Sequence, residues 1–479
     1  MQLRLPARDA PAAEAHDTFR NELASLNTDG RRRWIYARQP SGPYYRARTI
    51  VAVFLLAFLL LAPFIMVHGQ PLMLLNVLER RFVLLGVVFP PQDFGLVVLI
   101  ALVAIISVLL ATVVGGRIWC GWMCPQTIFM EMVFRKLEYV IEGSAEQQLR
   151  RNRGPWTTEK VLRKGSKQAI FFAMSFVIAN VFLAWVIGAG ALRVIVTDSP
   201  GRHLGGLSAI VLFTSVFYLV FARFREQACV LACPYGRMMS ALIDAQTVTV
   251  TYDGGRGEPR GRIVAGAPPG SAGDCIDCHR CVTVCPTGID IRNGIQLECV
   301  ACTACIDACD DVMERVGRPP GLIRHASAAE VRGGTPHRWL TGRVTAYSGV
   351  WLLLVGVLAV LLSIRPDLDV LVLRQAGTLY VALPGGDVAN FYTVQALNRT
   401  GHAAAFEIDV IEPRGATVTP LGSLGPVAPH SVLDGRFLLR VPRSGLTGPS
   451  TSVRVRIRSH GQAVQTIESA FLGPGSTDR

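Results

Sequence analysis

The cysteines are the residues of this chain whose spacing says most about chemistry. Eight of them form two runs with the spacing Cys-x2-Cys-x2-Cys-x3-Cys, one at Cys275, Cys278, Cys281 and Cys285 and one at Cys299, Cys302, Cys305 and Cys309. In such runs three cysteines wrap one [4Fe–4S] cluster and the fourth ligand comes from the other run. We therefore predict two clusters, one held by Cys275, Cys278, Cys281 and Cys309 and one by Cys285, Cys299, Cys302 and Cys305.

Zinc is the alternative occupant of closely spaced cysteines. Zinc sites typically use pairs of cysteines or histidines rather than two complete runs of four, so the pattern favours iron–sulfur. Asp310 follows the second run where Pro286 follows the first, but all eight ligands are present. This departure therefore leaves the cluster type unchanged.

The other four cysteines form two Cys-x3-Cys-Pro pairs, each preceded by an arginine. A spacing of four places both thiols of a pair on one helix face, and the proline prevents a normal helix at the cysteine before it. Four soft sulfur ligands favour Cu(I), so the pairs could bind copper. A dithiol switch or simple packing at helix ends stays open. The residues concerned are Cys120, Cys124, Cys229 and Cys233, with Arg117 and Arg225.

Five stretches free of Asp, Glu, Lys and Arg are long enough to carry these cysteines on a membrane scaffold. A bilayer needs roughly 20 apolar residues per helix. The stretches are 49–67, 95–116, 169–192, 205–222 and 344–364. A composition with 50% hydrophobic and 17% charged residues agrees, because it is too apolar for an ordinary soluble enzyme. The shorter run 82–92 contains two prolines and is interpreted as interfacial.

Positive charge is concentrated on one side of the five predicted spans. Nine arginines precede the first span, ten Lys or Arg lie in 117–167 and fourteen Arg lie in 223–343, against two arginines in each of the loops 67–94 and 193–204. The positive-inside rule then predicts a multi-pass protein of the bacterial inner membrane with a cytoplasmic N-terminus. Because the +13 net charge follows the predicted membrane topology, we expect the chain to contact membrane lipid and not nucleic acid.

All twelve cysteines then lie on the cytoplasmic side or at the cytoplasmic ends of spans. Thiols stay reduced in that compartment, so we expect metal or redox chemistry rather than structural disulfides. At the opposite, outer end of the first hairpin lies His68. An ionisable group near the membrane boundary could bind a quinone head or a metal there, or it could anchor the helix end.

Beyond the fifth span the apolar pattern changes to period two, with Val453, Val455 and Ile457 alternating with arginines. Such alternation, interrupted by turn signals, predicts a small β-sandwich of about 110 residues. The predicted order is a cytoplasmic tail 1–48, hairpin 49–116, cytoplasmic loop 117–168, hairpin 169–222, cytoplasmic segment 223–343 with an α+β two-cluster ferredoxin-like core at 270–315, helix 344–364, and periplasmic all-β domain 365–479.

Over nearly its whole length the chain resembles the cytochrome c oxidase accessory protein family called CcoG, FixG or RdxA. The resemblance rests on His-Gly-Gln-Pro at 68–71, Phe-Pro-Pro-Gln-Asp at 89–93, both Cys-x3-Cys-Pro pairs, and Cys-Pro-Thr-Gly-Ile-Asp-Ile-Arg at 285–292 leading to Glu298 and Cys299. It implies five transmembrane α-helices, two [4Fe–4S] clusters and an immunoglobulin-like C-terminal sandwich. It also implies an oxidoreductase that reduces Cu(II) to Cu(I) during assembly of the C-family haem–copper oxidase.

Joined to the cysteine pattern, the resemblance implies that an electron donor of unknown identity reduces the clusters and that copper is the substrate. Oxidase assembly factors or copper chaperones would be the partners. Two other functions stay open. The chain could be a quinol-oxidising electron-transfer subunit, since the membrane ferredoxins of nitrate and nitrous-oxide respiration resemble it in their paired Cys-Pro motifs. It could also be a non-catalytic scaffold for oxidase assembly.

Overall fold

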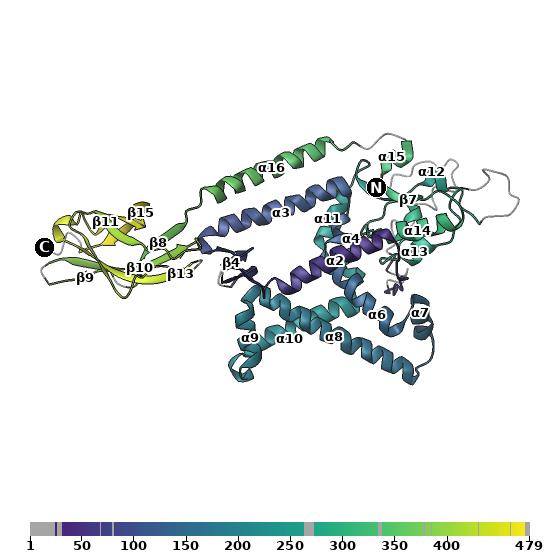
Figure 1. Ribbon diagram of the computed structural model, residues 1–479, viewed down its shortest axis with the longest axis horizontal. Coiled ribbons are helices and arrows are strands. Elements are labelled where there is room, and N and C mark those ends of the chain that lie inside the picture. Colours follow the sequence, from purple (N-terminus) through teal and green to yellow (C-terminus); the bar gives the residue numbers. More distant parts are fainter. Residues whose placement is uncertain are drawn as a thin grey trace, which may run out of the picture. The chain divides into compact units, whose positions relative to one another are not determined.

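The computed structural model describes residues 24–25, 31–67, 69–78, 81–262, 273–333, 338–375, 377, 379–384, 386–429, 431–459 and 461–474. The prediction for His68 lies outside these ranges. Figure 1 gives the helices and strands in chain order. The chain forms two compact units: unit 1 comprises Met1–Ala62, Val98–Ala184 and Ala189–Gly356, and unit 2 comprises Pro63–Val97, Trp185–Gly188 and Val357–Arg479.

Within the described ranges, five helices are long and apolar enough to cross a membrane, so the prediction of five spans is confirmed. They are α2 (Pro43–Leu61), α3 (Phe94–Gly115), α8 (Thr158–Ile187), α10 with the π-helical η5 (Leu204–Phe224) and α16 (Gly342–Ser363). The ends of α8 differ most from the prediction. The helix continues through a charged first part that the search for uncharged stretches left out, and it stops before Gly188, whose φ is +86°. A separate helix, α9 (Ala189–Thr197), follows.

Short helices follow both Cys-x3-Cys-Pro pairs and begin at the prolines. Cys124 and Cys233 have extended backbone, and α5 (Pro125–Ile128) and α11 (Pro234–Leu242) start immediately after them. Proline suits a first helical position because it has no N–H to satisfy there. The neighbouring elements are α4 (Ile118–Trp122), η3 (Phe129–Phe134), α6 (Arg135–Glu142), α7 (Ala145–Arg153), η4 (Pro200–Arg202) and η6 (Ala228–Ala232).

The ferredoxin-like insert of unit 1 lies between two strands, β6 (Val248–Tyr252) and β7 (Ile323–Ser327), which pair antiparallel. Between and after them are α12 (Gly254–Gly257), α13 (Arg280–Thr283), η7 (Ile291–Asn293), α14 (Ala304–Arg315) and α15 (Ala328–Gly333). Cysteines and aliphatic residues share its core, which includes Val250, Cys275, Cys281, Ile306, Met313 and Leu322.

A carboxylate of the insert caps the first spanning helix. Asp307 of α14 accepts hydrogen bonds from the backbone N–H groups of Tyr44 and Tyr45 at 3.1 and 2.8 Å. A negative charge at a helix N-terminus satisfies free N–H groups and opposes the helix dipole. Gly42 precedes the helix with φ +147°, and a Cβ there would lie 2.4 Å from the Asp307 side chain. The cap therefore requires glycine at this position.

Unit 2 contains the C-terminal sandwich. One sheet has the order β12-β13-β10-β8 with β9 also on β10, and the other has the order β11-β14-β15. The strands are β8 (Leu368–Arg374), β9 (Val381–Ala382), β10 (Val388–Asn398), β11 (Glu407–Glu412), β12 (Thr417–Pro420), β13 (Val432–Val441), β14 (Ser450–Ser459) and β15 (Gln462–Leu472), with η8 (Arg443–Gly445) after β13. Val453, Val455 and Ile457 are fully buried, as the alternation predicts.

Unit 2 also includes the segment that follows α2. It forms β1 (Met66–Val67), β2 (Gln70–Pro71), β3 (Met73–Asn76), β4 (Arg81–Leu84), β5 (Val87–Phe89) and η2 (Pro91–Asp93). The run 82–92 is thus mainly strand, because two of its residues, Phe82 and Val83, bury their side chains in pairing with β3. Asp93 pairs with Arg365 and, at 2.8 Å, with Arg399.

Candidate metal and redox centres

The two cysteine runs have the same unusual backbone on either side of their middle cysteines. Asp277 and His279 flank Cys278, and Ala301 and Thr303 flank Cys302, with φ between +52° and +64° in all four. Non-glycine residues in this left-handed region cost about 1–2 kcal/mol each, and they persist where surroundings enforce them at functional sites. Both runs are therefore shaped to curve around an occupant.

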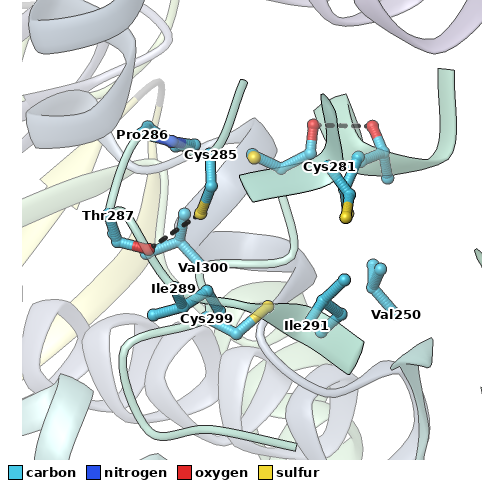
Figure 2. Close-up of a pocket in the computed structure, with 12 residues that line it drawn as sticks. Val250, Cys281, Cys285, Pro286, Thr287, Ile289, Ile291, Cys299 and Val300 are labelled. Atoms are coloured by element: carbon cyan, nitrogen blue, oxygen red, sulfur yellow. Dashed lines mark hydrogen bonds between the residues drawn. The ribbon is translucent and has the colours of Figure 1, made fainter. Parts of the chain in front are cut away.

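One cavity brings together the four thiols predicted for the second cluster. Its lining is almost entirely apolar apart from the sulfurs and the side chains of Thr287 and Thr303. In Figure 2 the sulfurs of Cys285 and Cys299 point toward the same space from opposite sides. The cysteines that line it are Cys281, Cys285, Cys299, Cys302 and Cys305. Cys281 of the first run reaches this cavity too, so the two predicted cluster positions are neighbours.

The thiols predicted for the first cluster also lie together. Cys309 of α14 is within electrostatic range of Cys275 and Cys278, and Cys281 is within range of Cys278 and Cys309. The structure thus brings the fourth cysteine of the second run to the first run. The ligand roles themselves stay a prediction.

Hydrogen-bond donors surround these sulfurs. The backbone N–H groups of Ala301, Ala304 and Ile323 face Cys299, Cys302 and Cys309 and lower the pKa of these thiols. The Cys285 sulfur lies 3.3 Å from the Thr287 hydroxyl (Figure 2). Donors to sulfur stabilise thiolates and tune the potential of a cluster that they hold. The residues present therefore fit [4Fe–4S] clusters.

Burial makes these thiols poor acids without metal. It raises the pKa of Cys281, Cys299 and Cys309 to about 12 and that of Cys302 to about 11. Cluster binding must therefore displace protons, which couples it to pH and to folding. Among the described residues, no group of three His, Cys, Asp or Glu side chains is arranged to hold a single metal ion. A four-iron cluster is larger than one ion and needs its thiols farther apart.

The four-thiol site consists of the two Cys-x3-Cys-Pro pairs, which the structure brings to one place. Cys229 interacts electrostatically with the other three members, Cys120, Cys124 and Cys233. Burial raises the pKa of Cys229 to about 12 and also raises that of Cys120. Gly236 permits the close packing, because a Cβ there would lie 2.6 Å from the Cys229 carbonyl oxygen. Two pairs that are over 100 residues apart in sequence thus lie near one another, although their thiols are not arranged to hold a single ion.

The arginines that precede the two pairs have different roles. Arg117 lies beside Cys120, and its charge opposes the rise that burial causes in the pKa of Cys120 and Cys229. Arg225 instead forms a buried bidentate ion pair with Glu138, at 2.6 and 3.2 Å. The sequence signalled both arginines equally, but only Arg117 belongs to the four-thiol site.

Sequence reasoning missed two residues beside this site, Arg48 and Gly121. Arg48 of α2 is buried and donates from Nε to the Gly121 carbonyl oxygen at 2.7 Å. Gly121 stands between the cysteines of the first pair, and this position was the only feature of the sequence that could have pointed to it. Arg48 immediately precedes the first predicted span, and its partner could not be assigned from sequence.

Comparison with known proteins connects these sites to families. Residues 94–141 match a 4Fe-4S binding domain, residues 224–328 a 4Fe-4S dicluster domain, and residues 358–474 the Ig-like fold at the C-terminus of FixG. Protein RdxA of Cereibacter sphaeroides is 34% identical over 92% of this chain and 98% of its own length. The nitrogen fixation protein FixG of Rhizobium meliloti is 32% identical over 82% of each chain. Protein RdxB of Cereibacter sphaeroides is 33% identical over 70% of this chain and 72% of its own.

This chain belongs to the FixG/RdxA family. Membership and the two 4Fe-4S matches make it a multi-pass membrane iron–sulfur protein of the electron-transfer type with an immunoglobulin-like C-terminal domain. All twelve cysteines of this FixG/RdxA-family chain fall within the two 4Fe-4S matches. The four-thiol site is divided between them, with one pair in each matched range.

Proposed function

We propose that this chain reduces Cu(II) to Cu(I) at the four-thiol site with electrons from its iron–sulfur insert. The observation that carries the proposal is the position of the four-thiol site. Cys120 packs in one hydrophobic cluster with Cys302 and Val300 of the second cysteine run. The cysteines proposed to bind copper thus lie directly against a cluster-binding segment, and their thiols must draw together to hold one ion.

The chemistry assigned to each part follows from its residues. A [4Fe–4S] cluster, when bound, stores and releases one electron at a time. Thiolates retain Cu(I) better than Cu(II), so the four-thiol site stabilises the product of reduction. Each copper ion takes up one electron. Arg117 supplies a fixed positive charge that favours the thiolate form of Cys120.

In the cell, the proposed product is Cu(I) for assembly of the C-family haem–copper oxidase. The resemblance to the CcoG family supports this role, with oxidase assembly factors or copper chaperones as recipients and an electron donor still to be found. The charge asymmetry of the loops supports an inner-membrane protein with the N-terminus and insert in the cytoplasm and the sandwich in the periplasm.

A second candidate is that the four-thiol site holds iron rather than copper. The 4Fe-4S match over 94–141 contains only the first cysteine pair, Cys120 and Cys124. An additional cluster would turn the site into a relay rather than the place of copper reduction. Metal analysis separates the candidates, since this one requires iron beyond that of two clusters.

The decisive experiment replaces Cys120, Cys124, Cys229 and Cys233 together with Ser. Full-length protein is purified anaerobically and its iron, sulfide and copper are counted. The clusters are then reduced with dithionite, excess dithionite is removed, and the reduction of added Cu(II) is followed. We expect iron and the cluster spectra to stay nearly unchanged, while copper binding and cupric reduction fall to background. A matched variant, Cys275→Ser, should lose iron instead.

Other outcomes identify other functions. Unchanged cupric reduction in the quadruple variant contradicts the copper site. If unaltered protein holds iron for more than two clusters and the quadruple variant loses the excess, the four-thiol site holds a further cluster and acts as a relay. Stoichiometric quinone in the purified protein supports quinol oxidation. Normal oxidase assembly with every cysteine variant supports a scaffold.

A further inference from the structure

The four-thiol site and the insert lie very close together at Gly121. A Cβ on this glycine would lie 2.4 Å from the Val300 carbonyl oxygen and 2.8 Å from that of Ala301. Real Cβ atoms do not tolerate such distances from backbone, so only glycine allows α4 to contact the second cysteine run here. Val300 and Ala301 lie between Cys299 and Cys302, and Gly121 follows Cys120. Two predicted metal sites therefore meet through backbone.

Two buried arginines hold this contact. Arg48 donates to the Gly121 carbonyl at 2.7 Å, and its charge also acts on Cys302. Arg117 donates to the Leu297 carbonyl and acts electrostatically on both Cys120 and Cys299. Each guanidinium thus interacts with both the four-thiol site and the second cysteine run.

Both arginines also have spare donors. Among the described residues, Arg48 Nη2 and Arg117 Nε are buried without a hydrogen-bond partner. An unpaired buried donor is costly, and each lies in a region of thiols that become anionic when they bind metal. This arrangement suits a contact between two sites that both carry negative charge when loaded.

We propose that the Gly121 contact, positioned by Arg48 and Arg117, is the junction across which electrons pass from the insert to the four-thiol site. The inference rests on the proposed function and specifies its route. One electron leaves the insert for each Cu(II) that becomes Cu(I), and no bond to the chain forms or breaks. The electron is replaced by a low-potential reductant, which is dithionite in the experiment. Cys275 and Cys278 of the first run line no part of this contact.

The test compares Gly121→Ala with Gly165→Ala in full-length protein. An added Cβ at Gly165 of α8 meets no atom within 4 Å, so this variant controls for a new methyl group in a helix. Protein is reduced with dithionite, freed of excess reductant and mixed with Cu(II) in a stopped-flow instrument. The loss of reduced-cluster absorbance and the formation of Cu(I) with a chelating dye are followed together. Iron content, cluster midpoint potentials and Cu(I) stoichiometry are measured on the same samples.

We expect Gly121→Ala to slow electron passage several-fold, because the added Cβ pushes α4 and the second cysteine run apart and electron transfer slows as the distance between donor and acceptor grows. Its iron content, midpoint potentials and Cu(I) stoichiometry should match those of Gly165→Ala. Arg48→Gln removes the hydrogen bond to Gly121 without adding bulk and should slow passage less. If Gly121→Ala loses iron or copper, its rate no longer reports on the junction, and the rate of Arg48→Gln becomes the test.

Unaltered rates in both Gly121→Ala and Arg48→Gln overturn the junction. That result differs from failure of the proposed function. In the latter case unaltered protein reduces no Cu(II), or the quadruple Ser variant reduces it normally, and the junction proposal is rejected with it.

Discussion

The cysteine-rich insert and the C-terminal sandwich achieve order in different ways. The sandwich has long strands, and β10 pairs with β13 over ten residues and with β8 over seven. Its buried core is aliphatic and aromatic, without cysteine. The insert has short elements, with four residues in α13 and twelve in α14, and cysteines occupy its core. We therefore expect the sandwich to fold from its own apolar burial and the insert to depend on its clusters.

The largest expected difference between the two regions is their side of the membrane. A reporter fused after Arg479 should be active only in the periplasm, because five spans and the positive-inside rule place the sandwich there. The same periplasm-dependent reporter inserted after Gly333, next to the insert, should be inactive, because the insert is predicted to be cytoplasmic. Fusions that report the same side would mean that one of the helices does not span.

Loss of a predicted cluster ligand should damage the insert and spare the sandwich. We expect Cys275→Ser and Cys299→Ser each to lose most iron of one cluster, since metal binding and folding are coupled. Iron and sulfide analysis with limited proteolysis measures this, and the fragment 365–474 should stay resistant. Full iron content in both variants would contradict the ligand assignment.

A cavity in the sandwich should have the opposite effect. Phe437 is fully buried and stacks on Tyr392 with ring centroids 5.4 Å apart. Phe437→Ala should destabilise the sandwich by about 3–5 kcal/mol. Proteolysis across a urea series reports this change, and iron content should stay constant. Leu373→Ala, at a residue that is 54% exposed, is the control with little effect. Iron loss in the Phe437 variant would mean that the insert and the sandwich are not stabilised independently.

A smaller effect is expected at the ion cluster of unit 2. Asp93→Asn removes the carboxylate shared by Arg365 and Arg399, whose side chains are 9% and 10% exposed. Partial solvation limits the loss to about 1–3 kcal/mol. The same urea series should show a shift smaller than that of Phe437→Ala. A shift of equal size would mean that this ion cluster contributes as much as the aromatic core.

Local patterns predicted most of the fold, because they depend on nearby residues. Apolar length identified five spans, and strict alternation identified Val453, Val455 and Ile457 as core. The start of α8 was missed because a helix can project charged side chains beyond the membrane. The strands in 82–92 were missed because their pairing depends on β3.

The site was predictable only as far as cysteine spacing reaches. Spacing proposed which thiols belong together, and the ligand assignment stays a prediction. Spacing could not show that Arg117 and Arg225 diverge, or that Gly121 meets Val300, because these contacts join segments more than 80 residues apart. Such relations depend on three-dimensional packing and leave no local pattern.

The Asp307 cap has a consequence for synthesis. The first spanning helix leaves the ribosome long before its cap, which lies 263 residues later than Tyr44. At about 5–20 residues per second, the start of α2 waits roughly 13–50 s for its carboxylate. During this interval its free N–H groups must be satisfied by water. The N-terminus of the first membrane helix is capped only when α14, the helix that carries Cys305 and Cys309, has formed. An early part of the chain thus reaches its final structure only after a later part has folded.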